Sequence, residues 1–257
     1  MAKAIGIFDS GIGGLTIASA VKKQHPNRQI VYFGDTLHLP YGDKSSKNIQ
    51  SYIKAITAFL YEQGCADIVV ACNSASSVLD GVALNHLDVH LTNVIDPVVE
   101  TIVNSDSIKR VGVIGTKRTI DSDVYSARIR SKRSDIDVFS LATPLLAPMI
   151  EEGFIHGDIA EKVIHEYLGE LPEIDALILG CTHYPLIRTE IDAFYNGSVR
   201  LFDAPELVAS SLKLHDEVPP GREDHFYVSD LTPAFEKTAK LFFGEQVKLE
   251  KSNLFRY

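Results

Sequence analysis

The chain has 257 residues, of which 45% are hydrophobic, so it is long enough to fill one large or two small hydrophobic cores. Its formal net charge of −9, without clustered Lys and Arg, argues against a phosphate-backbone partner, so no nucleic acid is expected. No stretch approaches the length of uncharged residues that crosses a bilayer, and the apolar run before Asp9 is too short for a secretory signal. We therefore expect a cytoplasmic globular protein with no membrane partner.

Short apolar runs typical of buried strands recur along the chain, with helical patterns between them. The runs are 4–10, 29–35, 67–73, 91–95, 110–116, 137–143, 176–181, 199–204 and 225–230. In the segment after Ser46, Ile49, Ile53, Ile56 and Leu60 fall at helical spacing on one face. This alternation predicts an α/β fold with right-handed crossovers and mainly parallel sheet.

Small polar residues gather where these runs end. They are Asp9-Ser10, Gly34-Asp35, Asn73-Ser74, Gly115-Thr116 and Cys181-Thr182-His183. Ligands of open α/β sheets bind outside the carboxyl ends of the strands, near helix N-termini, so these residues are expected to converge on one pocket. An internal echo supports two similar halves, because "VVACNSAS" and "LILGCTHYPL" each place a cysteine and a small polar residue after a buried strand.

The stretch "DSGIGGLT" is a weak match to a nucleotide-binding loop. Counting from Gly11 and Gly13, the third glycine of G-x-G-x-x-G would fall at Thr16, and no Lys-Ser/Thr pair follows. A tight strand-to-helix turn explains the glycines but does not require Asp9 and Ser10 at the strand end. We therefore interpret Asp9 and Ser10 as functional.

The three cysteines are Cys65, Cys72 and Cys181, with no C-x-x-C pair and no zinc-like spacing, so neither disulfides nor a metal are expected. Cys65 lies between a helix end and a strand and is interpreted as a buried structural residue. Cys72 and Cys181 each precede a predicted helix N-terminus, which is expected to lower the thiol pKa and make each a base.

Three classes of protein fit these residues. Cys181 with His183 would suit a cysteine hydrolase or transferase with an acyl-thiol intermediate, but that leaves Cys72 idle. Two thiols on opposed strand ends would suit a racemase, in which one removes a proton from a carbon and the other delivers one to the opposite face. A periplasmic-type binding module would need no reactive thiol, and the missing secretion signal disfavours it.

Six motifs, taken together and in order, resemble glutamate racemase, a member of the Asp/Glu racemase superfamily, over most of the chain. They are "IGIFDSGIGG", "YFGDTLHLPYGDK", "VVACNSAS", "VGVIGTKRTI", "PLLAPMIEEG" and "LILGCTHYPL". The resemblance implies two doubly wound, mainly parallel-sheet domains, related by a pseudo-twofold axis with the active site between them. The first domain would comprise residues 1–97 and 205–257, and the second residues 98–204.

The resemblance also implies a reaction, the interconversion of L- and D-glutamate without a cofactor, which supplies D-glutamate for peptidoglycan and so for the cell wall and cell shape. Cys72 would act on D-glutamate and Cys181 on L-glutamate, each as proton acceptor in one direction and donor in the other. Asp9 and His183 would tune the thiols. The family commonly forms dimers, so the resemblance allows a homodimer.

The residues implied in substrate binding are those at the matching motif positions. They are Asp9, Ser10, Tyr41, Gly42, Asn73, Ser74, Gly115, Thr116, Thr119, Glu151, Thr182 and His183. Hydroxyls, amides and helix N-termini can hold two carboxylates with few cationic side chains. Leu37 and His38 depart from the family, which more often has Ala or Arg-like residues there, and Ser74 stands where Thr is more common.

Overall fold

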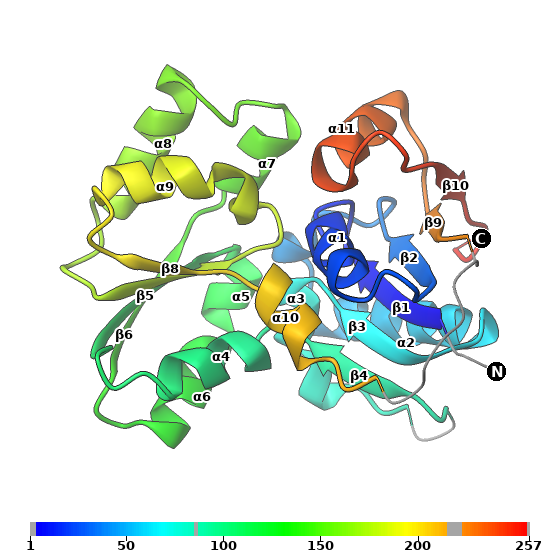
Figure 1. Cartoon of the computed structure of the whole chain (residues 1–257), viewed down its shortest axis with the longest axis horizontal. Coiled ribbons are helices and arrows are strands. Elements are labelled where there is room, and N and C mark those ends of the chain that lie inside the picture. Colours follow the sequence, from blue (N-terminus) through cyan, green and yellow to red (C-terminus); the bar gives the residue numbers. More distant parts are fainter. Residues whose placement is uncertain (1–3, 85–86, 215–222, 256–257) are drawn as a thin grey trace. The chain divides into compact units, whose positions relative to one another are not determined.

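A computed structural model describes residues 4–84, 87–214 and 223–255 of the chain (Figure 1). The chain forms two compact units. Unit 1 comprises Met1–Val94 and Pro205–Tyr257, and unit 2 comprises Ile95–Ala204. Each unit is described by itself below.

Unit 1 is built on a parallel sheet of six strands in the order β10-β9-β2-β1-β3-β4. Its strands are β1 (Ala4–Asp9), β2 (Ile30–Gly34), β3 (Cys65–Val70), β4 (His90–Asn93), β9 (His225–Val228) and β10 (Leu249–Lys251). Its α-helices are α1 (Leu15–Gln24), α2 (Ser46–Glu62), α3 (Asn73–Ser76), α10 (Pro205–Ser211) and α11 (Pro233–Phe243), and its short 3-10 helices are η1 (Tyr41–Asp43) and η2 (Leu79–Gly81).

Unit 2 is built on a parallel sheet of four strands in the order β6-β5-β7-β8. Its strands are β5 (Arg110–Gly115), β6 (Asp137–Ala142), β7 (Ala176–Gly180) and β8 (Arg200–Phe202). Its helices are α4 (Asp96–Val103), α5 (Lys117–Asp121), α6 (Val124–Lys132), α7 (Leu146–Glu151), α8 (Asp158–Leu168), the 3-10 helix η3 (Tyr184–Ile187) and α9 (Arg188–Phe194). The pair α8 and α9 lies on one side of this sheet, and the pair α4 and α6 lies on the other (Figure 1).

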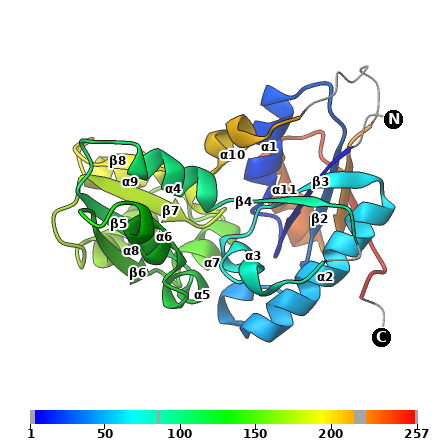
Figure 2. The same cartoon turned by 90° about the horizontal axis from the view of Figure 1, so that it is seen from below.

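Helices cover both faces of the unit 1 sheet (Figure 2). The predicted apolar face of α2 is confirmed, because Ile49, Ile53, Ile56 and Leu60 are all fully buried. They pack in one core cluster with alternate residues of the strands, including Phe8. Side chains at successive strand positions point to opposite faces of a sheet, so the remaining apolar strand residues serve the face covered by α1.

Each of the nine apolar runs overlaps a strand, and every strand pairing in the described part of the chain is parallel, so the predicted α/β class is confirmed. Strand β10 was not predicted. It has three residues, two of them charged and exposed, and among the residues that the structure describes it pairs only with β9, at the sheet edge. No helix in the described part of the chain combines the length and apolar character needed to span a membrane.

Candidate active site

Four neighbouring strands of the unit 1 sheet have the same order as the four strands of the unit 2 sheet. They are β2-β1-β3-β4 in unit 1 and β6-β5-β7-β8 in unit 2, which in each unit are the second, first, third and fourth strands along the chain. The winding therefore reverses between the first and third strands, and ligands of open parallel sheets bind at the carboxyl ends of such strands. Cys72 follows β3 and Cys181 follows β7, so each cysteine lies at this switch point of its own unit.

The Asp9 carboxylate of unit 1 lies inside the glycine-rich turn that follows β1. Its Oδ2 accepts hydrogen bonds from the backbone N–H of Gly14 at 2.9 Å and of Gly11 at 3.3 Å. A Cβ on Gly14 would lie 2.5 Å from the Asp9 Cβ, so this position requires glycine. The buried Tyr32 hydroxyl donates to the Gly11 carbonyl over 2.9 Å and fastens the turn from below. The glycines of "DSGIGG" thus shape a turn around a carboxylate rather than around a phosphate.

Cys72 is buried beside this turn, with its thiol donating to the Ser10 hydroxyl over 3.5 Å. Burial and, after it, the nearby Asp9 charge raise the pKa of the Cys72 thiol to about 12, against the opposing effect of hydrogen bonds with Ser10 and Ala75. The prediction of a lowered pKa is therefore wrong for Cys72. The helix that follows, α3, has only four residues, and its dipole is too weak to offset desolvation and a neighbouring anion.

Asp9→Asn is expected to lower the pKa of Cys72, because it removes the negative charge while an amide oxygen can still accept from Gly14. Each unit of pKa changes the thiolate fraction tenfold, so alkylation of Cys72 at about pH 9 should become at least about threefold faster. The measurement is iodoacetamide labelling as a function of pH, read by peptide mass spectrometry. An unchanged pH midpoint would contradict the assigned influence of Asp9.

The other predicted residues of unit 1 lie on neighbouring elements. Asn73 and Ser74 are buried in the first turn of α3. Tyr41 begins η1, and its buried hydroxyl is engaged in a hydrogen bond that it donates to Asp35 Oδ2 over 2.6 Å. The backbone of Tyr41 and of the half-buried Gly42 is therefore what this loop can offer to a substrate.

In unit 2, strands β5 and β7 bring two predicted segments together, since Gly115 pairs with Gly180 in register. Thr116 caps α5, and its Oγ1 accepts from the backbone N–H of Thr119 over 3.3 Å. The two threonine hydroxyls are 3.1 Å apart. Thr182 is buried directly after Cys181. This edge thus offers hydroxyl groups and a helix N-terminus next to a thiol.

Cys181, His183 and Glu151 form a chain of contacts in unit 2. His183 Nδ1 lies 3.6 Å from the Cys181 sulfur, and His183 Nε2 lies 3.0 Å from Glu151 Oε1. Burial lowers the pKa of His183, but hydrogen bonds to Cys181 and Glu151 outweigh it and hold the pKa well above its usual value. Of the two neighbouring glutamates, Glu151 makes this contact, while Glu152 is exposed.

A hydrogen-bonded tyrosine–threonine pair that the sequence analysis did not identify stabilises the carboxyl ends of the strands in unit 2. The Thr143 and Tyr184 hydroxyls are 2.6 Å apart and buried, and Thr143 Oγ1 donates to the Gly115 carbonyl. Thr143 ends the run "DVFSLAT", so its place at a strand end was a usable signal, whereas its partner, 41 residues away along the chain, was not.

Cys65 differs from the other two cysteines. It begins β3, at the opposite end of that strand from Cys72, and is fully buried in the core of unit 1. Burial is the main cause that raises its pKa to about 12. A core thiol in this setting is expected to be inert.

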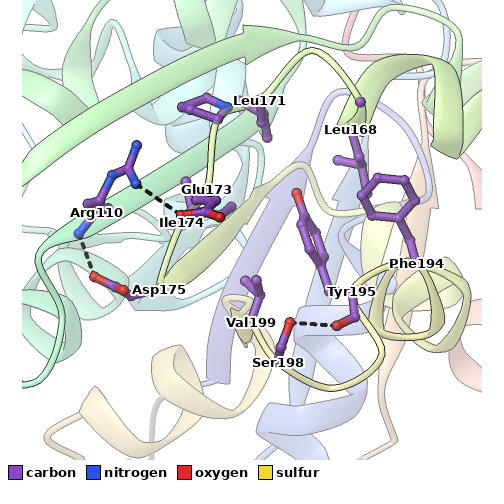
Figure 3. A pocket seen from close by; sticks show the side chains of 12 residues that line it. Arg110, Leu168, Leu171, Glu173, Ile174, Asp175, Phe194, Tyr195, Ser198 and Val199 are labelled. Atoms are coloured by element: carbon purple, nitrogen blue, oxygen red, sulfur yellow. Dashed lines mark hydrogen bonds and ion pairs between the residues drawn. The ribbon is translucent and has the colours of Figure 1, made fainter.

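A cavity of about 580 Å³ lies at the amino-terminal ends of β5 and β7 in unit 2, opposite the strand ends that carry the candidate site residues (Figure 3). Arg110 lies beside Glu173 there, and the backbone N–H of Arg110 donates to Asp175. The residues that line it include no candidate site residue. Among the described residues, no group of three or more His, Cys, Asp and Glu side chains is arranged to hold a metal ion.

The sequence profile of the Asp/Glu/Hydantoin racemase family matches residues 16–212. The fold and the cysteines at the two switch points thus occur in a chain that belongs to this racemase family, and so to enzymes rather than binding modules.

Comparison with individual proteins shows which members of the family this chain resembles. Glutamate racemase from Aquifex aeolicus (strain VF5) is 40% identical over 95% of both chains. The crystal structure of glutamate racemase from Francisella tularensis subsp. tularensis SCHU S4 in complex with D-glutamate is 36% identical, covers 100% of this chain and 99% of its own, and gives a TM-score of 0.90. A glutamate racemase isoform from Bacillus anthracis gives a TM-score of 0.91 at 30% identity, with 98% of each chain covered.

Proposed function

We propose that this protein interconverts L- and D-glutamate by two-base proton transfer at Cα, with Cys72 and Cys181 as the bases and no cofactor. The observation that carries the proposal is the matched pair of switch points: each unit offers a buried thiol after its third strand, beside Asp9 in unit 1 and beside His183 in unit 2. Near-full-length similarity to glutamate racemases supports the choice of substrate.

The proposed reaction balances in protons. One cysteine, as thiolate, removes the Cα proton and becomes a thiol, and the other, as thiol, donates its proton to the opposite face and becomes a thiolate. The product is the mirror image, and the enzyme is left ready for the reverse direction. We assign Cys72 to D-glutamate and Cys181 to L-glutamate, and the mechanism requires both thiols to reach the same Cα from opposite faces.

The raised pKa of Cys72 fits this proposal if substrate binding relieves it. A glutamate ammonium group next to Asp9 would neutralise the charge that raises the pKa, and so favour the thiolate when substrate is present. The carbanion that develops would be stabilised by donors around the α-carboxylate, for which Asn73, Ser74 and Thr182 are the candidates. Their burial keeps water from weakening those hydrogen bonds.

The remaining assignments follow the same division. Ser10, Tyr41 and Gly42 in unit 1, and Gly115, Thr116, Thr119 and Glu151 in unit 2, would bind the substrate. The expected domains, residues 1–97 with 205–257 and residues 98–204, would each supply one base. In the cell, the enzyme would act in the cytoplasm, and its product D-glutamate would serve peptidoglycan synthesis. The enzyme would be able to form a homodimer.

Racemisation in heavy water tests the proposal. With L-glutamate as substrate, the D-glutamate formed early should carry deuterium at Cα while the remaining L-glutamate keeps protium, because different groups remove and deliver the proton. Chiral chromatography with mass detection measures both pools. Equal labelling of both enantiomers from the start would rule out two bases, and unchanged L-glutamate would reject the function.

The contact chain Cys181–His183–Glu151 also matches an activated thiol nucleophile, which keeps a hydrolase as the second candidate. That function needs a covalent acyl-thiol at Cys181 and leaves Cys72 without a role. Intact-mass measurement during turnover distinguishes the two, because proton transfer adds no mass to the protein.

A further inference from the structure

Asp35 is a fully buried carboxylate that follows β2 and collects hydrogen bonds from three side chains. The Tyr41 hydroxyl donates to Oδ2 over 2.6 Å and the Ser229 hydroxyl donates to Oδ1 over 2.8 Å. His38 Nδ1 lies 2.9 Å from both oxygens. A carboxylate only accepts hydrogen bonds, so His38 carries its proton on Nδ1 here.

The His38 ring is held in place by aromatic neighbours. It stacks on Tyr52 of α2, with ring centroids 4.2 Å apart and planes 15° apart. Phe255, near the C-terminus, meets it edge-on at 4.7 Å and also contacts Phe33 of β2. His38 thus ties the loop after β2 to α2 and to the C-terminal segment.

The same loop is fastened at its start to the end of β9. The backbone N–H of Leu37 donates to the Ser229 hydroxyl, and Thr36 exchanges hydrogen bonds with the Asp230 backbone. The loop then leads into η1, which begins with Tyr41. Since His38 and Tyr41 both contact the Asp35 carboxylate, the position of His38 is coupled to that of Tyr41 through Asp35.

We propose that His38 is a positioning residue that holds the Tyr41–Gly42 backbone in its substrate-binding place through Asp35. The proposal rests on the proposed function, which gives this backbone its ligand. The contacts described for His38 are with Asp35, Tyr52 and Phe255, and none of these is a candidate catalytic group. A backbone contact that binds substrate and transition state alike affects KM rather than kcat.

Two substitutions separate the hydrogen bond of His38 from its ring packing. His38→Phe keeps an aromatic ring but loses the donor, whereas His38→Asn keeps an N–H group near the Nδ1 position but loses the ring. A hydrogen bond to a charged group is strong enough that its loss should change an equilibrium by about tenfold. We expect His38→Phe to raise KM for both glutamate enantiomers by about tenfold with kcat within about twofold, and His38→Asn to restore most of the KM.

Amide hydrogen exchange gives a readout that does not depend on glutamate turnover. In His38→Phe, peptides covering 36–44 should exchange about tenfold faster, while peptides from β1 and β3 keep wild-type rates and report an intact fold. His90→Asn is the matched control, because His90 belongs to the same unit and its side chain is 76% exposed. It should match the wild type in both measurements.

The outcomes separate this proposal from the proposed function. Wild-type exchange and KM in His38→Phe would overturn the role of His38, and equal impairment of the Phe and Asn variants would overturn its assignment to the hydrogen bond. Absence of glutamate turnover in the wild-type protein would reject the proposed function, and hydrogen exchange would still decide whether His38 holds the loop. If His38→Phe fails to fold, His38→Leu replaces it as the variant without a donor.

Discussion

Cys72→Ala and Cys181→Ala are each expected to abolish racemisation in both directions, with turnover lowered by at least about a thousandfold. In the proposed mechanism each thiol is the acceptor in one direction and the donor in the other, so the loss of either would interrupt both. The hydrogen-bonding groups that we propose to orient glutamate would remain in either variant, but they cannot supply a base. Circular dichroism or chiral chromatography, in reactions started separately from L- and D-glutamate, would measure the loss.

Cys65→Ala is the matched control for these variants, because it removes a buried thiol of unit 1 from the other end of β3. We expect its turnover to stay within about twofold of the wild type, since a core thiol acts as a small apolar group. Near-wild-type turnover in Cys72→Ala or Cys181→Ala would remove that cysteine from the mechanism. A large loss in folded Cys65→Ala would overturn its structural role.

The strands were predictable because parallel strands are buried on both faces and appear in the sequence as continuous apolar runs. Helix α2 was predictable because its four buried apolar positions follow helical spacing. Strand β10 was not, because two of its three residues are charged and only the pairing with β9 defines it.

The site was predictable where it depends on strand ends, and not where it depends on tertiary contacts. Asp9 and Cys72 come together because β1 and β3 are neighbours in the sheet, and the small polar residues at both strand ends had indicated a shared pocket. The bond from Ser229 to Asp35 joins residues 194 positions apart, and no local pattern indicates it. The predicted direction of the Cys72 pKa shift was wrong for the same reason, because the burial of the thiol and its proximity to Asp9 depend on tertiary structure.

The repeated strand order explains why the two cysteine-containing motifs of the sequence resemble each other. In both units a cysteine follows the third strand, but the neighbouring groups differ: a carboxylate in a glycine turn in unit 1, and a histidine–glutamate pair in unit 2. One thiol therefore has an anion beside it and the other an imidazole with a raised pKa. Two bases that must begin a reaction in opposite protonation states benefit from such unlike surroundings.

Gly34→Ala is expected to destabilise the protein by about 2–3 kcal/mol, which corresponds to a fall of roughly 5–10 °C in apparent melting temperature. Gly34 ends β2 opposite Asp9, and a Cβ there would lie 2.2 Å from the Gly11 carbonyl oxygen, a backbone atom. That carbonyl also accepts the Tyr32 hydroxyl, and the Gly11 N–H donates to Asp9, so the turn cannot move aside without losing these bonds. The displaced turn should also lower glutamate turnover, because Ser10 lies within it.

Gly11→Ala separates this clash from the general effect of adding a methyl group. Its Cβ would meet only the Leu39 Cδ1, at an ordinary contact distance of 3.7 Å, so stability should stay within about 1 kcal/mol of the wild type. Differential scanning fluorimetry of both variants measures the contrast. Equal melting temperatures would mean that the turn yields to Gly34→Ala at little cost, and that its hold on the Asp9 carboxylate is looser than these contacts indicate.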